Sequence, residues 1–424
     1  MALRLHLEYE DQCIAEQMNS VSNPMVLAGA PPARKRSIVP ITVLGVCVLT
    51  ATAIFALLHP IHDFVEYWTA AHLLMSGKDP YSLGEVFRME KALGFEQSIP
   101  IMLLSPPWTL PLLAPLGLAK SYALGWIFWI AVMVAFVAWS SRLLMDVYFG
   151  DIRISEISDT VFCRALFAFT FYPILLCLKY AQTAPLMLLG IAGFLYFERQ
   201  KKDLLAGALL SLTLIKPQLF LIVWLALILW SFKVHRWKPL ASALGCTVLL
   251  TVAAVALDRH VFQQYRLLTN SPYLQVYASG VAAGIRRQFG GVGTFWMQLV
   301  PPALGLGWFA GYWRKYSKTW SWTKNLPMLL TVSVATSAYG WLFDQTLLVL
   351  PVIALAARRA HKFGRLPGRS VWFYTALNFA LMIVMPFPTL NLLPAPICFA
   401  VLLMCDSRAG EVAATNGQLQ LCAE

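Results

Sequence analysis

The sequence predicts an all-α polytopic membrane protein with about twelve transmembrane helices. Of its 424 residues, 58% are hydrophobic and only 13% are charged, whereas soluble domains are nearer one quarter charged. From residue 38 onward, apolar runs long enough to cross the roughly 30 Å hydrocarbon core of a bilayer recur to within the last thirty residues. A soluble domain carried on a single membrane anchor is therefore excluded.

The predicted spans follow the apolar runs in chain order. They lie near 38–58, 121–143, 160–178, 183–197, 203–215, 217–232, 239–257, 292–312, 326–341, 342–357, 371–387 and 389–404. Residues 34–406 are expected to form a single transmembrane domain. Residues 1–33 lack an apolar core, so they indicate a disordered cytoplasmic tail or a mis-set start codon and not a signal peptide. Residues 407–424 predict a second cytoplasmic tail.

The basic residues orient the chain. They cluster in short connections at Arg34-Lys35-Arg36, Arg199/Lys201/Lys202, Lys233/Arg236/Lys238, Arg314/Lys315/Lys318/Lys324 and Arg358/Arg359/Lys362/Arg365/Arg369. Cytoplasmic loops of membrane proteins carry an excess of Lys and Arg. Placing the first cluster inside puts every later cluster inside as well, and we expect both termini in the cytoplasm.

Charge and cysteine content exclude several other classes of site. The net charge of +12 is spread over these connections and forms no single patch, so nucleic acid is not implied. The eight cysteines show neither CxxC nor any paired spacing, which indicates neither a disulfide framework nor a zinc site. Walker A, GxGxxG, GxSxG and HExxH motifs are also absent from the sequence.

Two connections on the outer side are long, at 59–120 and 258–291. In the first, 63–75 predict a helix with Asp63, Glu66, Tyr67 and Ala70 on one face, by their i, i+3 and i+4 spacing. Residues 83–96 predict an amphipathic stretch. The apolar stretch 99–119 contains five prolines if Pro100 is included, so a re-entrant or interfacial segment is favoured over a straight helix.

Asp63 is the first candidate for chemistry, because carboxylates beside a membrane face are costly unless they serve a purpose. It is placed to act as a general base on an acceptor hydroxyl. Glu66, one turn further on, would raise the proton affinity of Asp63 or bind substrate itself. The alternative is structural, since an aspartate ahead of an apolar helix is a common N-cap.

Outward-facing cations form the second group of candidates. The short runs 203–215 and 217–232 meet at Lys216-Pro217-Gln218, and half-helices meeting at such a break often build a membrane binding site. Lys216, Lys179, Arg286 and Arg287 would suit a lipid phosphate or pyrophosphate. Ordinary contact with anionic lipid or a snorkelling lysine is the competing explanation. Asp344 lies between two apolar runs, where a carboxylate argues for function.

At these residues the chain resembles glycosyltransferase family 87, whose members include polyprenol-phosphate-mannose-dependent mannosyltransferases. The resemblance rests on Asp63-Phe64, Tyr67, Ala70 or Ala71, Leu74, Gly77, Asp79-Pro80-Tyr81, Ser105-Pro106-Pro107, Pro111, Pro115, Gln182, Ala206-Gly207, Lys216-Pro217, the stretch from Tyr339 to Asp344, and Pro351. The chain departs from the family where Ala181 replaces a frequent glycine, and in its bulky apolar residues between Tyr339 and Asp344.

The resemblance implies a fold of the C superfamily of membrane glycosyltransferases in the bacterial inner (plasma) membrane. It implies that a sugar, mannose or arabinose as first guesses, moves with inversion from a polyprenyl-phosphate donor to a glycolipid or glycan acceptor. Asp63 would be the base, without a metal or other cofactor. Substrate would be bound by Glu66, Tyr67, Asp79, Tyr81, Lys179, Gln182, Lys216, Arg286, Arg287 and Asp344.

Two other functions compete with a transferase. A transporter or flippase of lipid-linked sugars would share the polytopic form and the broken helix pair. Transporters built from inverted repeats show matched motifs in their two halves, and the Asp63–Tyr81 pattern has no second copy. A polymerase or ligase of lipid-linked glycans usually carries its large outer loop late in the chain, whereas here the dominant loop comes first.

Overall fold

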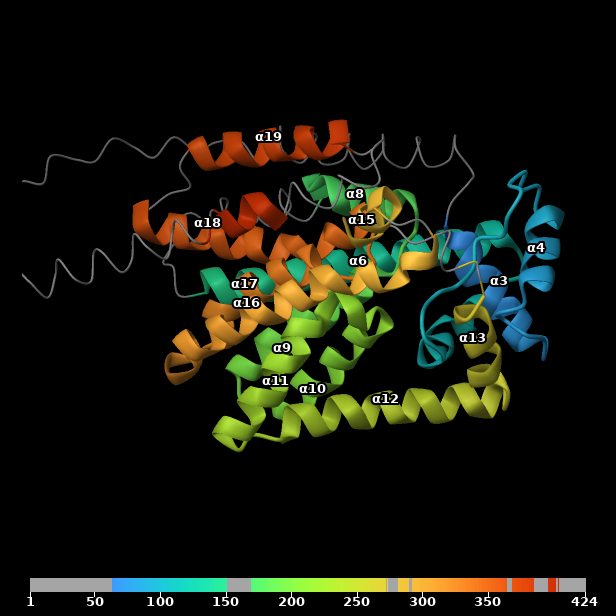
Figure 1. The fold of residues 1–424 in the computed structure, drawn as a ribbon, viewed down its shortest axis with the longest axis horizontal. Helices are drawn as coiled ribbons and strands as arrows, with labels where there is room; N and C mark the ends of the chain where they lie inside the picture. Colours follow the sequence, from blue (N-terminus) through green and yellow to red (C-terminus); the bar gives the residue numbers. More distant parts are fainter. Residues whose placement is uncertain are drawn as a thin grey trace, which may run out of the picture. The chain divides into compact units, whose positions relative to one another are not determined.

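The computed structural model describes residues 63–150, 169–271, 273, 281–289, 292–363, 368–384, 396–401 and 403. Within these ranges every regular element is a helix (Figure 1), which confirms the all-α prediction for the part described. The predicted span 38–58, the tails 1–33 and 407–424, and parts of the spans 160–178, 371–387 and 389–404 lie outside the described residues. All described residues belong to one compact unit, 43–424.

The elements follow one another with short connections. They are α3 Phe64–Met75, α4 Leu83–Ala92, η1 Pro107–Thr109, α5 Leu110–Leu113, η2 Ala114–Leu118, α6 Tyr122–Phe149, α8 Tyr172–Lys179, α9 Ala184–Arg199, α10 Asp203–Leu210, η3 Ser211–Ile215, η4 Pro217–Phe220, α11 Leu221–Val234, α12 Lys238–Leu257, α13 Val261–Thr269, α15 Val281–Phe289, η5 Val292–Leu299, α16 Val300–Tyr316, η6 Ser317–Thr319, α17 Trp322–Ala335, η7 Leu342–Leu348, α18 Val349–Phe363 and α19 Gly368–Val384, where η denotes a 3₁₀ helix.

Three helices in the described ranges are long and apolar enough to cross a membrane: Tyr122–Phe149, Pro217–Val234 and Lys238–Leu257. Two shorter apolar helices, Asp203–Ile215 and Trp372–Val384, accompany them. α12 exposes Leu244, Val248, Leu249 and Val252 along its length. A helix that presents large aliphatic side chains outward in this way suits lipid and not water, so the chain has the character of a membrane protein.

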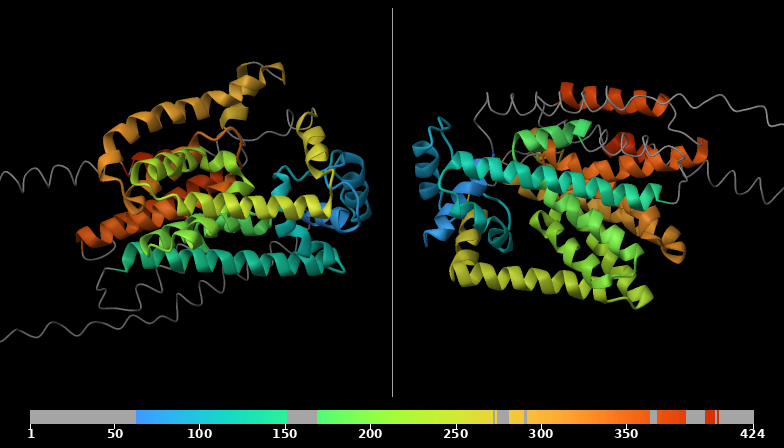
Figure 2. Two further views of the ribbon diagram at one scale, coloured as in Figure 1. Left: turned by 90° about the horizontal axis from the view of Figure 1, so that it is seen from below. Right: turned by 180° about the vertical axis from the view of Figure 1, so that it is seen from behind.

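α9 forms the centre of the helix packing. Its residues from Ala184 to Leu195 are all buried, and it packs against α6, α10, η3 and η7. α10 in turn packs against α12, which leads from the end of α11 to α13 beside η1 (Figures 1 and 2). The buried side chains of these helices belong to one continuous hydrophobic cluster. This cluster holds the segments that carry the polar residues described below.

Two interruptions of the helical backbone shape the site described below: one around Lys216, where the 3₁₀ helices η3 and η4 meet, and one directly before the 3₁₀ helix η7. The first, here called the lysine break, comprises residues 216–218, and Lys216 leaves helical geometry with φ −134° and ψ 75°. Pro217 has no N–H to continue the helix, and the nearby Leu214 carbonyl instead accepts a hydrogen bond from Trp108 Nε1 at 2.9 Å. The predicted meeting of two half-helices at this position is confirmed. The second interruption, the aromatic break, comprises residues 336–341 between α17 and η7.

The N-terminal segment, residues 63–118, contains α3, α4, an irregular stretch and three short helices. Ser82 caps α4, because its hydroxyl accepts a hydrogen bond from the Glu85 N–H. Pro107, Pro111 and Pro115 each occupy the first turn of a short helix, where a missing N–H is tolerated. The prediction that this proline-rich stretch does not form one straight helix is therefore confirmed.

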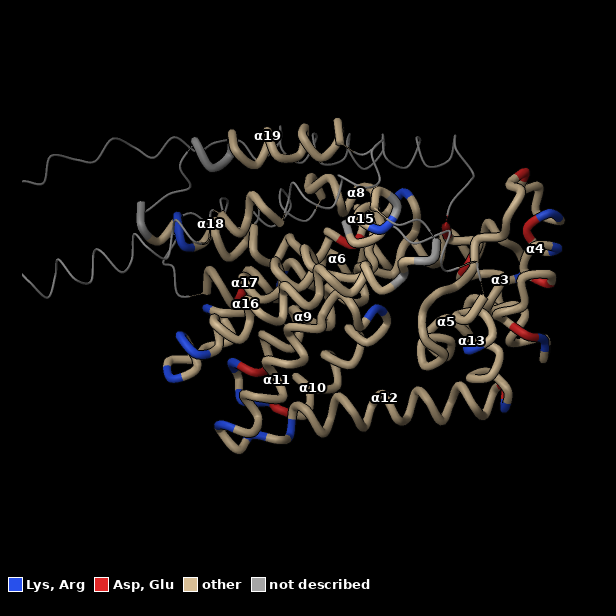
Figure 3. Tube along the Cα trace, in the orientation of Figure 1, with Lys and Arg blue, Asp and Glu red and all other residues tan. Residues whose placement is uncertain are grey.

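Charge is distributed unevenly along the bundle. The basic residues at the ends of α9, α11 and α16, and those that start α12, lie at the same end of the bundle (Figure 3). α3, α4 and α13 lie at the opposite end, where acidic residues accompany the basic ones (Figure 3). There Glu85 pairs with Lys78 at 3.4 Å and also with Arg88. The end that carries α3 is thus the less basic of the two.

The contact between α10 and α12 predicts a steric requirement at Gly207. A Cβ atom there would collide with the carbonyl oxygen of Pro239, which is rigid backbone. We expect Gly207→Ala to lower the free energy of unfolding by about 1–3 kcal/mol, measured as a lower apparent melting temperature in detergent. Gly245→Ala on exposed α12 meets no atom within 4 Å, so it should preserve or raise that temperature. Equal melting temperatures for the two variants would contradict this packing.

Candidate functional site

A cavity of about 470 Å³ lies where the N-terminal segment meets the two breaks. Its walls come from the start of α3, the irregular stretch 97–106, the end of α8, the lysine break, the α13 region and residues 339–343. Among the predicted site residues, the lining includes Asp63, Glu66, Tyr67, Gln182 and Lys216. Polar residues far apart in the sequence therefore share one cavity.

Asp63 stands at the N-cap position of α3 but does not cap the helix with its side chain. Its Oδ2 instead accepts a hydrogen bond of 2.8 Å from Gln182 Nε2, and Gln182 lines the same cavity. The alternative interpretation, that this carboxylate serves only as a helix cap, requires a hydrogen bond from a backbone N–H of the first turn of α3 to the Asp63 side chain. That hydrogen bond is not formed. The side chain is free of that structural task and faces a cavity.

Glu66 and Tyr67 extend this contact into a network. Tyr67 donates its hydroxyl hydrogen to Gln182 Oε1 at 2.7 Å, and Gln182 Nε2 lies 3.5 Å from Glu66 Oε1. The predicted helical face is confirmed for Asp63, Glu66 and Tyr67, since one glutamine contacts all three. Gln182 is almost fully buried, so its amide has few other partners available.

The two carboxyl groups differ in their affinity for a proton. Burial raises the pKa of Asp63 to about 6, although the hydrogen bond from Gln182 and the positive charge of Lys216 oppose this shift. Burial and the neighbouring charge of Asp63 raise the pKa of Glu66 to about 8. Near pH 7 the pair therefore holds one proton, mostly on Glu66. A carboxylate ready to accept a proton is the form that a general base needs.

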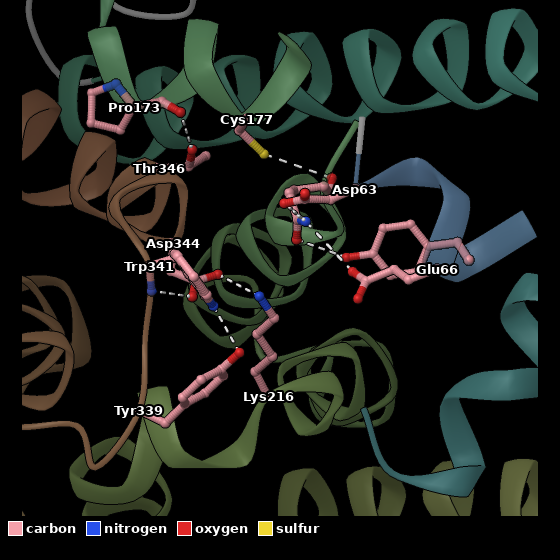
Figure 4. Close-up of polar contacts among 11 residues, drawn as sticks. Asp63, Glu66, Pro173, Cys177, Lys216, Tyr339, Trp341, Asp344 and Thr346 are labelled. Atoms are coloured by element: carbon pink, nitrogen blue, oxygen red, sulfur yellow. Dashed lines mark hydrogen bonds and ion pairs between the residues drawn. The ribbon is translucent and has the colours of Figure 1, made fainter. Parts of the chain in front are cut away.

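Lys216 is held by a buried ion pair. Its Nζ donates to Asp344 Oδ1 at 2.8 Å, and the other oxygen of Asp344 accepts the Trp341 backbone N–H at 2.9 Å. Asp344 is fully buried, while 11% of the Lys216 side chain is exposed. The ammonium lies between Asp344 and the Asp63–Glu66 pair (Figure 4). The Lys216 ammonium therefore lies at the cavity wall, and the Asp344 carboxylate that binds it lies outside the cavity lining.

The remaining predicted residues lie outside the cavity lining. Asp79 Oδ1 accepts a hydrogen bond from the Tyr81 N–H at 2.8 Å and so forms a turn before α4. Tyr81 is buried and donates to the Ser105 carbonyl at 3.1 Å, which supports the cavity wall from behind. Lys179 lies at the end of α8, with its Nζ 5.4 Å from the centre of the Tyr180 ring.

Arg286 and Arg287 lie on α15, and neither lines the cavity. The Arg286 side chain is buried, and the Arg287 side chain lies outside the described part of the structure. Within the described residues no group of three or more His, Cys, Asp or Glu side chains is placed to hold a metal ion.

Several aromatic residues of the cavity were not among the predicted site residues: Tyr180, Tyr265, Tyr273, Tyr339, Trp341 and Phe343. The alternating aromatic residues at 339, 341 and 343, directly before a carboxylate, were a visible signal. No sequence pattern indicated Tyr265 or Tyr273, because their hydroxyl groups contact backbone carbonyls that are more than 160 residues away in the sequence. Tyr265 donates to the Leu104 carbonyl at 3.2 Å, and Tyr273 donates to the Pro100 carbonyl at 2.8 Å.

A model of glycosyltransferase family 87 matches residues 104–386, which is more than half of the chain. The matched region contains Gln182, Lys216 and Asp344 and begins after Asp63 and Glu66. No curated protein and no solved structure matches the chain.

The ion pair between Lys216 and Asp344 predicts a stability effect that depends on both partners. Lys216→Met leaves a fully buried carboxylate without its cation, so it should lower the free energy of unfolding by about 3–5 kcal/mol. The double variant Lys216→Met/Asp344→Asn should recover much of that loss, because the neutral amide still accepts the Trp341 N–H. Thermal unfolding in detergent measures both, and a double variant no more stable than the single one would contradict the pairing.

Proposed function

Because the chain belongs to glycosyltransferase family 87, we propose that its cavity is the site at which a sugar moves from a polyprenyl-phosphate donor to an acceptor hydroxyl. Family membership establishes glycosyl transfer, and the donor, the side of the membrane and the stereochemistry are part of the proposal. The observation that carries it is a cavity with two chemically different poles. One pole holds Asp63 and Glu66, and the other holds Lys216.

Asp63 is the general base of the proposed reaction. Its carboxylate takes the proton of the acceptor hydroxyl, and the hydroxyl oxygen forms a bond to the anomeric carbon of the donor sugar. The bond from that carbon to the phosphate oxygen breaks, and its electron pair leaves with the lipid phosphate. Attack from the face opposite the leaving group inverts the configuration at the anomeric carbon.

Lys216 stabilises the departing phosphate. The donor is a phosphodiester with one negative charge, and its product is a phosphomonoester with up to two. A fixed cation near the oxygen that gains charge stabilises the transition state more than the ground state. Asp344 holds the ammonium at 2.8 Å and so keeps the long lysine side chain in place before substrate binds. In this proposal Asp344 supports Lys216 and does not itself touch the substrate, since it is fully buried behind it.

The aromatic residues of the cavity suit a sugar ring. Trp341 and Phe343 stack with ring centroids 5.9 Å apart, and Phe343 also lies 5.1 Å from the Lys216 ammonium. Flat apolar ring faces beside hydrogen-bonding groups are typical of small-molecule sites that fix an amphipathic ligand. We infer that the donor sugar, mannose as the first choice, lies between this surface and the Asp63 pole, with a glycolipid or glycan as acceptor.

The proposed setting is a multi-pass protein of the bacterial inner membrane with a fold like that of the C superfamily. The basic end of the bundle would face the cytoplasm, together with both termini, and α3 and the cavity would face outward. A transporter or flippase of lipid-linked sugars has no comparable support, because family membership indicates transfer and because a transporter would not need a carboxylate at its outer mouth.

Transfer assays with Asp63→Asn test the reaction. In lipid, the purified wild type should transfer sugar from at least one member of a panel of radiolabelled polyprenyl-phosphate sugars. Its rate should rise as pH increases through about 6, because only the ionised carboxylate accepts a proton. Asp63→Asn should lose at least about 100-fold of that rate, the lower range for a general base. A folded variant with the wild-type rate would remove Asp63 from the reaction.

Cysteine labelling tests the orientation. In a chain without its native cysteines, Lys91→Cys on α4 should react with a membrane-impermeant maleimide on intact cells, whereas Lys318→Cys on η6 should react only after lysis. Both positions are exposed, so accessibility to solvent does not distinguish them. The reverse pattern would place the cavity on the cytoplasmic side and overturn the proposed donor location.

A further inference from the structure

Two carboxyl groups line the cavity one helical turn apart, and nothing in their spacing decides which one is the base. We propose that Gln182 makes this choice: it is a positioning residue that keeps Asp63 ionised and leaves Glu66 protonated, with Tyr67 fixing the direction of its amide. This inference rests on the proposed function and adds a role that the proposed reaction does not require by itself.

The direction of the amide follows from its neighbours. Tyr67 donates to Gln182 Oε1 at 2.7 Å, so the NH₂ group must point the other way, toward the carboxyl groups. A rotated amide would turn its carbonyl oxygen toward an ionised Asp63, and two acceptors cannot bond to one another. The phenol therefore specifies that a donor faces Asp63.

The position of Gln182 is fixed through its backbone. Its N–H donates to the Cys177 carbonyl at 2.9 Å, which ends α8 in a tight turn. The turn requires Ala181 to adopt a left-handed φ of +52°, a conformation that is unfavourable for a non-glycine residue. Trp129 of α6 donates to the Ala181 carbonyl at 2.7 Å, and Ala181 itself is fully buried. Lys201 and His235 adopt a similar φ at the ends of α9 and α11, so this conformation belongs to the turn that ends a helix. Hydrogen bonds to α8 and from α6 thus fix the position of Gln182.

The amide treats the two carboxyl groups unequally. Its Nε2 lies 2.8 Å from Asp63 Oδ2 and 3.5 Å from Glu66 Oε1, so only Asp63 receives a short hydrogen bond. A hydrogen bond donated to a carboxylate favours its ionised form. The resulting charge on Asp63 then repels a second charge on Glu66. Glu66 remains a neutral acid on the cavity wall, able to donate its own hydrogen to a substrate oxygen.

Other groups facing the pair do not explain the asymmetry. Lys216 lowers the pKa of both carboxyl groups, so it does not select between them. Tyrosine side chains also approach from neighbouring elements: Tyr67 on α3, Tyr122 on α6, Tyr180 after α8 and Tyr339 in the aromatic break. A phenol is ordinarily neutral below about pH 9, and burial keeps it so. Tyr67 also hydrogen-bonds to Glu66 and lowers its pKa, which opposes the asymmetry. Among these groups, Gln182 is therefore the one that favours ionisation of Asp63 over Glu66.

The test is the pH dependence of kcat in matched variants. Gln182→Met keeps the length of the side chain but removes the donor, so the rise in kcat should move upward by roughly one pH unit. The rate should then fall about fivefold near pH 6, approach a tenfold loss at lower pH, and recover at higher pH. Tyr67→Phe should shift the profile in the same direction by less. Gln200→Met and Tyr196→Phe, which are near the end of α9 and remote from the cavity, should keep the wild-type profile.

The outcomes separate this inference from the proposed function. An unchanged profile in monodisperse, folded Gln182→Met, or a loss of equal size at every pH, would overturn the positioning role while Asp63→Asn stays inactive. Full transfer by Asp63→Asn would overturn the proposed function itself. Infrared titration reads the pair without turnover. Glu66→Gln should remove a protonated carboxyl band that the wild type shows at pH 7, and Gln182→Met should strengthen that band. The inference would be refuted if the band changed in neither variant.

Discussion

The ion pair between Lys216 and Asp344 joins the lysine break to the 3₁₀ helix that follows the aromatic break. A charge buried in a medium of low polarity is strongly unfavourable unless an opposite charge and hydrogen bonds accompany it. Asp344 has both, from the Lys216 ammonium at 2.8 Å and the Trp341 N–H at 2.9 Å. The two breaks must therefore face each other, and the cavity forms in the space that they leave.

The cost of burying charge also governs the carboxyl pole, where Asp63 and Glu66 would both be negatively charged if both were ionised. Asp63 and Glu66 lie too close for both to ionise without a large electrostatic cost, so one proton is shared unequally between them. In the proposed arrangement Gln182 decides which of the two carboxyl groups keeps the proton. It does so because an amide, unlike a carboxylate or a phenol, presents a donor on one side and an acceptor on the other. A neutral residue can in this way determine the charge of its neighbours.

The wall opposite these poles is held by hydrogen bonds and not by regular structure. The irregular stretch 97–106 receives support from Glu90, whose carboxylate accepts the Ile101 N–H at 2.9 Å, and from Tyr273, which accepts the Met102 N–H at 3.1 Å. Tyr81 and Tyr265 bind carbonyls of the same stretch. Backbone that forms neither helix nor sheet needs partners for its polar groups, and here side chains from the α4 region, from α13 and from residue 273 provide several of them.

The sequence by itself determined the helical class, three of the apolar spans (121–143, 217–232 and 239–257), the proline-marked break at Lys216, and the shared face of Asp63, Glu66 and Tyr67. These features depend on local rules: apolar length, the missing N–H of proline and the 3.6-residue period of a helix. Tertiary structure alone decided that Gln182 reaches Asp63 across 119 residues and that Asp344 pairs with Lys216 across 128. It also placed Lys179, Arg286 and Asp79 away from the cavity lining. Spacing along the chain does not encode which helices pack together, and only that packing decides which polar groups share one buried space.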